Sequence, residues 1–326
     1  MFGSNQRQKL IHTGNGTLDR VLGGGFLCQT VNLFERQGPS SKILDSILNK
    51  TIATTALSKG VSLLLVNFNT ATQISREEFE ASLPLNRQVK SELLYKDIRA
   101  ATSSAKIKIA WRYSQRGTSS PTDSSQLMSQ VDFGLSLKKE TLDKHSGVDS
   151  LGQIDIINVK ADDELSDIVK KMVDMTEKSK SSNSDNVTIV LIKDILHPFS
   201  PVVDEQDLLM NYIYSFRCLA RTLDNTVISL SYDIDMCPEH DSIKEKIYNL
   251  ADSVLRFHSY ETDENEMTGY KDIDGAIDYI KVPKVNSYGF FFQRELSDWG
   301  YRITKNNRYF VIDELSLPPC EETVQP

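Results

Sequence analysis

The sequence has no run of apolar residues long enough to cross a membrane as a helix, which takes about 18 or more of them. Its first ten residues, MFGSNQRQKL, also lack the apolar stretch of a secretory signal. The cysteines are few and none is in a CxxC pair, so neither a zinc site nor a disulfide framework is indicated. They are Cys28, Cys218, Cys237 and Cys320. We therefore expect a soluble, intracellular protein without an intrinsic metal, whose thiols are reduced and mostly structural.

Basic residues are in deficit, because 37 lysines and arginines against 45 aspartates and glutamates give a formal net charge of -8. This balance argues against coating nucleic acid through bulk charge and leaves room only for a local basic strip. The 326 residues, 39% of them hydrophobic, are enough for one large α/β core or two smaller ones. We expect one domain over residues 13–316, between short tails at 1–12 and 317–326.

Short β-rich runs alternate with segments of helical periodicity along most of the chain. The runs are TVNLFE (30–35), VSLLLVNF (61–68), KIKIAWRY (106–113), IDIINV (154–159), VTIVLI (187–192), TVISLSY (226–232) and DSVLRFHS (252–259). Three helical stripes, which begin at Leu44, Leu165 and Leu209, each lie between two runs, as in a βαβ crossover. Because continuous apolar strands are expected when helices cover both faces of a sheet, we predict a mostly parallel α/β sheet flanked by helices.

The end of the chain follows a different pattern. AIDYIKVP (276–283) and NRYFVIDEL (307–315) read as strands without strong helices between them. They predict an antiparallel extension at one edge of the sheet. Polar or acidic stretches near 114–130, 177–186 and 260–274 indicate inserted loops.

Residues 13–26, TGNGTLDRVLGGGF, resemble the opening of RecA/KaiC-like ATPases, in which a short helix and a glycine turn precede the first core strand. The glycines also suit an ordinary helix end, where they supply positive φ, and the two interpretations are compatible. The resemblance implies a RecA-like fold.

In active members of that class, the loop after the first strand reads GxxxxGK[ST]. Its backbone amides hold phosphates, its lysine reaches the β and γ oxygens, and its hydroxyl binds Mg²⁺. Here residues 36–43 read RQGPSSKI, so the glycine before Lys42 is missing and an isoleucine replaces the hydroxyl residue. A reshaped loop could hold a nucleotide through Gly38, Ser40, Ser41 and Lys42. We favour the alternative in which Ser40 or Ser41 caps the next helix and Lys42 is solvated.

Asp194 follows the strand VTIVLIK (187–193), where such folds carry a carboxylate that orients Mg²⁺ or its water. We add it to the candidate nucleotide site. A strand-end aspartate is also a common turn or capping residue, and beside a degraded phosphate loop we favour that role. The chain is therefore not expected to be an autonomous ATPase.

Several segments in matching order and spacing resemble one family, the fourth subunit of Elongator, over roughly residues 10–320. They are KIKIAWRY (106–113), LHP (196–198), RCLART (217–222), LADSV (250–254), GAIDYIKVP (275–283) and YFVIDELSLPP (309–319). The resemblance implies a RecA-like subunit without a normal phosphate loop. It also implies a heterohexameric ring with two copies each of the fourth, fifth and sixth subunits.

In that family the ring binds transfer RNA near the anticodon and hydrolyses ATP, which modulates RNA release. The resemblance thus implies ATP and Mg²⁺ at subunit interfaces. The carboxymethyl-type chemistry on the wobble uridine belongs to the catalytic Elongator subcomplex. This chain is then expected to be a non-catalytic accessory subunit in the cytoplasm, with the nucleus as a second compartment. Two other functions stay open: an active KaiC-like ATPase with a reshaped phosphate loop, and an inert scaffold without RNA contact.

A basic strip with interleaved aromatic residues runs from Arg99 to Thr122 without an acidic residue. It is the best local candidate for phosphate contact and base stacking. The candidate RNA-binding residues are Lys106, Lys108, Arg112 and Arg116. Alternation along a strand leaves a plainer interpretation open, in which these residues face solvent and their apolar neighbours face the core.

Three further features have a structural and a functional interpretation. Arg217 and Arg221 are one helical turn apart and could reach a neighbouring subunit's nucleotide, but we favour a salt-bridged helix surface. His197 precedes a proline and is expected to hydrogen-bond backbone in a turn. A second basic cluster, Arg302, Lys305 and Arg308, is expected at the solvated tip of a hairpin.

Overall fold

The computed structural model describes the chain in ten stretches. They are residues 9–38, 41–86, 131–136, 152–182, 187–202, 206–234, 241–259, 274–281, 301–305 and 310–314. The strand predicted at 106–113 and the loop predicted at 114–130 lie outside the described residues.

Helices and strands alternate along the described chain. In order they are β1 (Leu10–Ile11), α1 (Gly16–Val21), β2 (Phe26–Leu27), β3 (Thr30–Gln37), α2 (Ser41–Ser58), β4 (Ser62–Asn67), α3 (Arg76–Ser82), β5 (Pro84–Asn86), β6 (Val131–Ser136), β7 (Ile154–Asn158), α6 (Leu165–Ser182), β8 (Thr188–Lys193), α7 (Gln206–Thr222), β9 (Thr226–Asp233), α8 (Asp241–Leu250), β10 (Ser253–Ser259), β11 (Gly275–Lys281), β12 (Tyr301–Lys305) and β13 (Phe310–Glu314).

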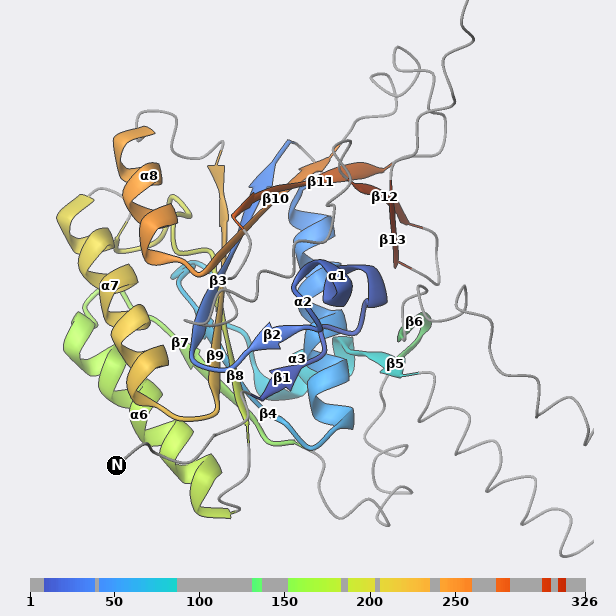
Figure 1. Cartoon of the computed structure of the whole chain (residues 1–326). Helices are drawn as coiled ribbons and strands as arrows, with labels where there is room; N and C mark the ends of the chain where they lie inside the picture. Colours follow the sequence, from blue (N-terminus) through green and yellow to red (C-terminus); the bar gives the residue numbers. More distant parts are fainter. Residues whose placement is uncertain are drawn as a thin grey trace, which may run out of the picture.

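The centre of the molecule is a nine-stranded sheet with the order β13-β12-β11-β10-β3-β9-β8-β4-β7. From β10 to β7 every neighbouring pair is parallel. Beyond β10, the strands β11, β12 and β13 continue the sheet in antiparallel pairs, which confirms the predicted edge extension (Figure 1). Because β9 lies between β3 and β8, those two strands are not neighbours, but both end at the same carboxyl edge.

Helices cover both faces of the parallel part of the sheet. In Figure 1, α6, α7 and α8 lie on one side and α1 and α2 on the other. Successive strand residues divide between the two cores: Leu33 and Val190 pack with α6, α7 and α8, whereas Phe34 and Leu191 pack with α1 and α2. Burial on both faces explains why these strands read as continuous apolar runs.

One stretch predicted as a loop is partly helical. Helix α6 continues through Ser182, so the first part of the stretch 177–186 is helical. Glu177 and Lys178 are good helix formers, and the Thr176 hydroxyl donates to carbonyls of the preceding turn, so nothing stops the helix at 176. Polar composition alone therefore placed the boundary wrongly.

The N-terminal signature is held by its own polar contacts. Asn15 caps α1 by accepting hydrogen bonds from two backbone amides of its first turn. Asp19 on this helix accepts hydrogen bonds from both the backbone N–H and the hydroxyl of Thr13, at 2.6 and 2.7 Å. The three glycines at 23–25 all have positive φ, as a sharp turn into β2 requires. The signature is thus explained by local structure.

A buried carboxylate ties β3 to its neighbours on the far side from α2. Glu35 has no exposed surface and accepts hydrogen bonds from the hydroxyls of Tyr232 and Tyr248. It also pairs with Nε of Arg256 at 2.9 Å. These contacts join β3, β9, α8 and β10 through one side chain. A buried charge needs this degree of pairing to be tolerated.

Candidate functional site

The candidate phosphate loop lies at the carboxyl edge of the sheet, between β3 and α2. Gly38 has a φ of 94°, and a Cβ there would come within 2.7 Å of the Ser259 carbonyl oxygen, so only glycine fits. The backbone of Ser41 begins α2, whereas Ser40 and the side chain of Ser41 lie outside the described residues. Lys42 is exposed, as the solvated alternative predicted.

Asp194 follows β8 at the same edge and adopts a left-handed backbone conformation with a φ of 59°. A short turn continues from it, because the His197 N–H donates to the Asp194 carbonyl at 3.0 Å. The position matches the predicted strand-end carboxylate. Its side-chain partner is Arg36, which the sequence alone does not assign to the site.

Arg36 pairs with Asp194, one of the candidate residues. It lies near the end of β3, and its side chain is only 5% exposed. Nη1 donates to Oδ2 of Asp45 at 3.4 Å, and Nη2 donates to Oδ1 of Asp194 at 3.1 Å. The guanidinium therefore joins β3, α2 and the end of β8. We refer to Arg36, Asp45 and Asp194 as the carboxyl-edge triad.

Asp45 is the most buried member of the triad, with a side chain that is 2% exposed. Burial raises the pKa of Asp45, while the nearby Arg36 and Lys193 cations and the Ser231 hydroxyl oppose that shift. Within the described part of the chain, Oδ1 of Asp45 and Nε of Arg36 have no hydrogen-bond partner. The triad is thus an ion-pair cluster whose hydrogen-bonding capacity is only partly used.

This geometry differs from what binding of Mg-nucleotide requires. There, a free strand-end carboxylate orients the metal, a lysine reaches the phosphates and a hydroxyl completes the site. Here Asp194 pairs with an internal arginine, Lys42 points to solvent and Ile43 is 49% exposed in place of the hydroxyl residue. A nucleotide role for Gly38, Ser40, Ser41, Lys42 and Asp194 stays a prediction, and the triad argues against it. The described residues contain no cluster of three or more His, Cys, Asp or Glu side chains that could hold a metal.

The turn after Asp194 presents a pair of rings at this edge. The Phe199 N–H donates to Nδ1 of His197 at 3.2 Å, so the predicted backbone contact of this histidine is confirmed. The two ring centroids are 5.6 Å apart. Thr70, from the loop after β4, donates its hydroxyl to the Phe199 carbonyl at 2.6 Å. The turn is therefore fixed from both sides, although Phe199 itself is 59% exposed.

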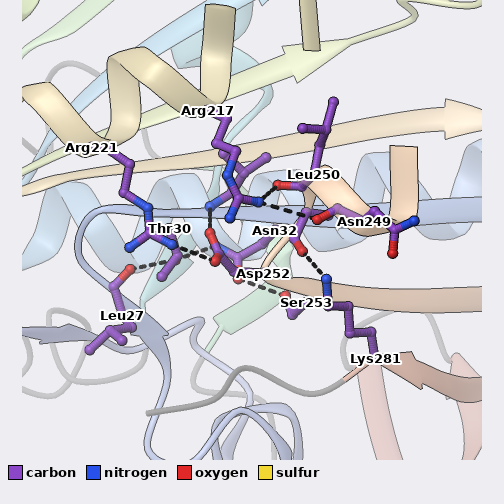
Figure 2. A network of polar contacts seen from close by, with 12 residues as sticks. Leu27, Thr30, Asn32, Arg217, Arg221, Asn249, Leu250, Asp252, Ser253 and Lys281 are labelled. Carbon is purple, nitrogen blue, oxygen red and sulfur yellow. Dashed lines mark hydrogen bonds and ion pairs between the residues drawn. The ribbon is translucent and has the colours of Figure 1, made fainter. Parts of the chain in front are cut away.

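A second polar network lies where β3 and β10 begin, at the opposite edge of the sheet (Figure 2). Arg217 of α7 donates to the carbonyls of Asn249 and Leu250 at the end of α8. Arg221 pairs with Oδ1 of Asp252 at 2.7 Å. This confirms the salt-bridged interpretation for Arg221, whereas Arg217 binds helix-end carbonyls instead of a carboxylate. A cation suits the carboxyl end of a helix, where carbonyls are left unpaired.

Asp252 continues this network into the sheet. Its Oδ2 accepts the Val31 N–H at 2.9 Å, and its own N–H donates to the Val31 carbonyl at 2.8 Å. Lys281 of β11 donates to the carbonyls of Tyr248 and Ala251 at 2.8 and 2.6 Å. The segments RCLART, LADSV and GAIDYIKVP therefore meet in one structural clamp.

The remaining candidates fall partly outside the described residues. The RNA-binding candidates Lys106, Lys108, Arg112 and Arg116 all lie there, so their role stays a prediction. The backbones of Arg302 and Lys305 belong to β12, which pairs with β13 as a hairpin, as expected. Of the thiols, Cys28 and Cys218 are described and both are free. Burial raises the pKa of Cys28 to about 11, so this thiol is unreactive.

The fold defines the class of protein: this is a RecA-like α/β chain. A solved structure described as "The Structure Of A DnaB-Like Replicative Helicase And Its Interactions With Primase" matches it with a TM-score of 0.51 and 17% identity. The match covers 95% of this chain and 64% of that chain, so this chain spans less than two thirds of the solved one. At this identity the likeness is one of fold alone. Among the described helices, none is long and apolar enough to span a membrane.

A family model described as PAXNEB protein matches residues 3–325, and the chain belongs to this family. Elongator complex protein 4 of Mus musculus is 25% identical over 342 aligned residues, which cover 96% of this chain and 78% of the relative. Elongator complex protein 4 of Homo sapiens is 24% identical, with 96% and 77% covered. The resemblance to the fourth-subunit family, which the sequence motifs carried, is confirmed.

Replacing Arg36 by methionine should destabilise the chain strongly. The two carboxylates that share its guanidinium would lose their paired cation, and breaking a buried ion pair from one side costs about 3–5 kcal/mol of unfolding free energy. Urea denaturation of the full chain measures it. Asp45→Asn is the matched control, because it keeps the pair between Arg36 and Asp194 and removes the more buried charge. Equal losses in the two variants would contradict the assigned role of Arg36.

The two clamp arginines should differ in their contribution to stability. Arg221→Ala removes an ion pair with a half-exposed arginine, worth about 0.2–1 kcal/mol. Arg217→Ala leaves partly buried helix-end carbonyls without their charged donor, which costs about 1.5–3 kcal/mol. Thermal and urea unfolding of both variants give the comparison. The assignment fails if Arg221→Ala proves the more damaging substitution.

Proposed function

We propose that this chain is a non-catalytic accessory subunit of Elongator. Its support is the family match over residues 3–325, together with relatives whose name is Elongator complex protein 4. In this proposal it assembles with subunits 5 and 6 into a heterohexameric RecA-like ring that holds two copies of each. The RecA-like fold of the chain suits such a ring.

The proposed ring binds transfer RNA, and ATP with Mg²⁺ at subunit interfaces modulates release of the RNA. It thereby supports the 5-carboxymethyl-type modification of the wobble uridine, which the catalytic Elongator subcomplex carries out. The proposed compartment is the cytoplasm, with the nucleus as a second location.

The carboxyl-edge triad is the observation that favours an accessory role over an independent ATPase. Asp194 is paired with Arg36 and Lys42 is exposed, which supports a chain that does not hold Mg-nucleotide by itself. The chain then contributes shape and surface to the assembly, and ATP binds where other subunits supply the missing groups.

RNA binding by the co-expressed ring tests this proposal. A native mass equal to two copies of each subunit first verifies that the ring has formed. We expect this ring to bind an anticodon stem-loop with an affinity that falls as salt rises, because lysines and arginines release counter-ions from phosphates. Changing all four candidate RNA-binding residues, Lys106, Lys108, Arg112 and Arg116, to alanine should weaken binding and flatten the salt dependence.

A matched control removes four other positive charges from exposed sites on the described surface. These are Lys59, Lys160, Lys170 and Lys246, each changed to alanine. This ring should keep the salt slope of the unmodified ring. Unchanged RNA binding by the first variant ring would remove the proposed surface and favour an inert scaffold. A failure to form the heterohexamer would instead overturn the proposed assembly.

A further inference from the structure

Two carboxylates from different elements meet at the guanidinium of Arg36, and a hydroxyl from a third element contacts one of them. Asp45 comes from α2, Asp194 from the end of β8, and Ser231 from β9, the strand between β3 and β8. The Ser231 hydroxyl donates to the same Asp45 Oδ2 that accepts from Arg36, at 3.4 Å. Two carboxylates thus share one internal cation, and the hydroxyl lies against the Asp45 carboxylate.

This donor set is the one that hard divalent cations prefer. Mg²⁺ and Mn²⁺ take carboxylate and hydroxyl oxygens, and Mg²⁺ often needs only one or two carboxylates because it keeps several of its waters. Oδ1 of Asp45 accepts no hydrogen bond from the described residues, although the Asp45 side chain is only 2% exposed. The carboxylate therefore has one buried oxygen that forms no hydrogen bond to the described residues.

We propose that Asp45, Asp194 and Ser231 form a cation site that Arg36 fills from within the chain, and that a divalent cation of the Mg²⁺ or Mn²⁺ class occupies it once the guanidinium is removed. Arginine is never deprotonated in proteins, so the internal cation is permanent. The unmodified chain consequently takes up no divalent cation at this edge. This inference goes beyond the proposed function and does not depend on ring assembly or RNA.

The test measures Mn²⁺ uptake by the full chain carrying Arg36→Ser, through loss of the electron paramagnetic resonance signal of free Mn²⁺. The variant should bind about one Mn²⁺ ion per chain and lower the signal of free Mn²⁺ by that amount. The unmodified chain should remove none. Adding Asp194→Asn to the variant should restore the free signal, because one of the two carboxylate ligands is lost.

Arg256→Ser is the matched control for breaking a buried ion pair. It releases Glu35, which is a single carboxylate already hydrogen-bonded by two tyrosine hydroxyls. This variant should leave the free Mn²⁺ signal unchanged. Uptake by Arg256→Ser equal to that by Arg36→Ser would show a general effect of exposed charge and would overturn the proposal.

A second measurement keeps the proposal falsifiable if loss of the arginine unfolds the chain. Arg36→Ser and the bulkier Arg36→Gln are each unfolded thermally with and without Mn²⁺. The proposal expects an upward shift in Tm, or recovery of the fold, on adding Mn²⁺, and no shift for the unmodified chain. Folded variants without Mn²⁺ uptake, or unfolded variants that Mn²⁺ does not recover, would overturn it.

Discussion

The ion pairs of Arg36 connect the elements that meet at the carboxyl edge of the sheet. Arg36 extends from β3, pairs with Asp45 of α2 and with Asp194 after β8, and is almost fully buried. Because arginine keeps its charge, the two carboxylates are balanced without an external cation. In a RecA-like ATPase this edge would receive Mg-nucleotide. In this chain the strand-end carboxylate Asp194 is paired with an internal charge instead.

The two ends of the parallel strands therefore have different roles. The carboxyl edge carries the triad, together with the exposed Phe199 and Ile43 side chains. At the amino edge, Arg217 and Arg221 fasten α7 to the end of α8 and to Asp252. Asp252 in turn contacts β3, because its carboxylate accepts the Val31 N–H and its own N–H donates to the Val31 carbonyl. The motif residues Arg217, Arg221 and Asp252 thus have a structural role at this edge. Function must be sought at the other edge and on surfaces beyond the described residues.

Much of the fold could be predicted because the strands are buried on both faces, which leaves continuous apolar runs in the sequence. The helix α3 also had a visible start signal, since Ser75 and Glu78 form a capping box that we did not use. Arg36 could not be placed in the same way. It reads as a polar residue before a glycine turn, and its partners Asp45 and Asp194 are 9 and 158 residues away. Whether a charged side chain is buried depends on the partners that the fold brings to it, and hydrophobic periodicity in the sequence does not reveal those partners.

Nucleotide turnover by the purified full chain tests the central claim most directly. The account predicts no Mg-dependent ATP hydrolysis by the chain alone, because Asp194 is paired internally and Lys42 faces solvent. Lys42→Ala should then leave the background rate unchanged. Turnover that requires Mg²⁺ and is abolished by Lys42→Ala would contradict the account and identify the chain as an active ATPase with a reshaped phosphate loop.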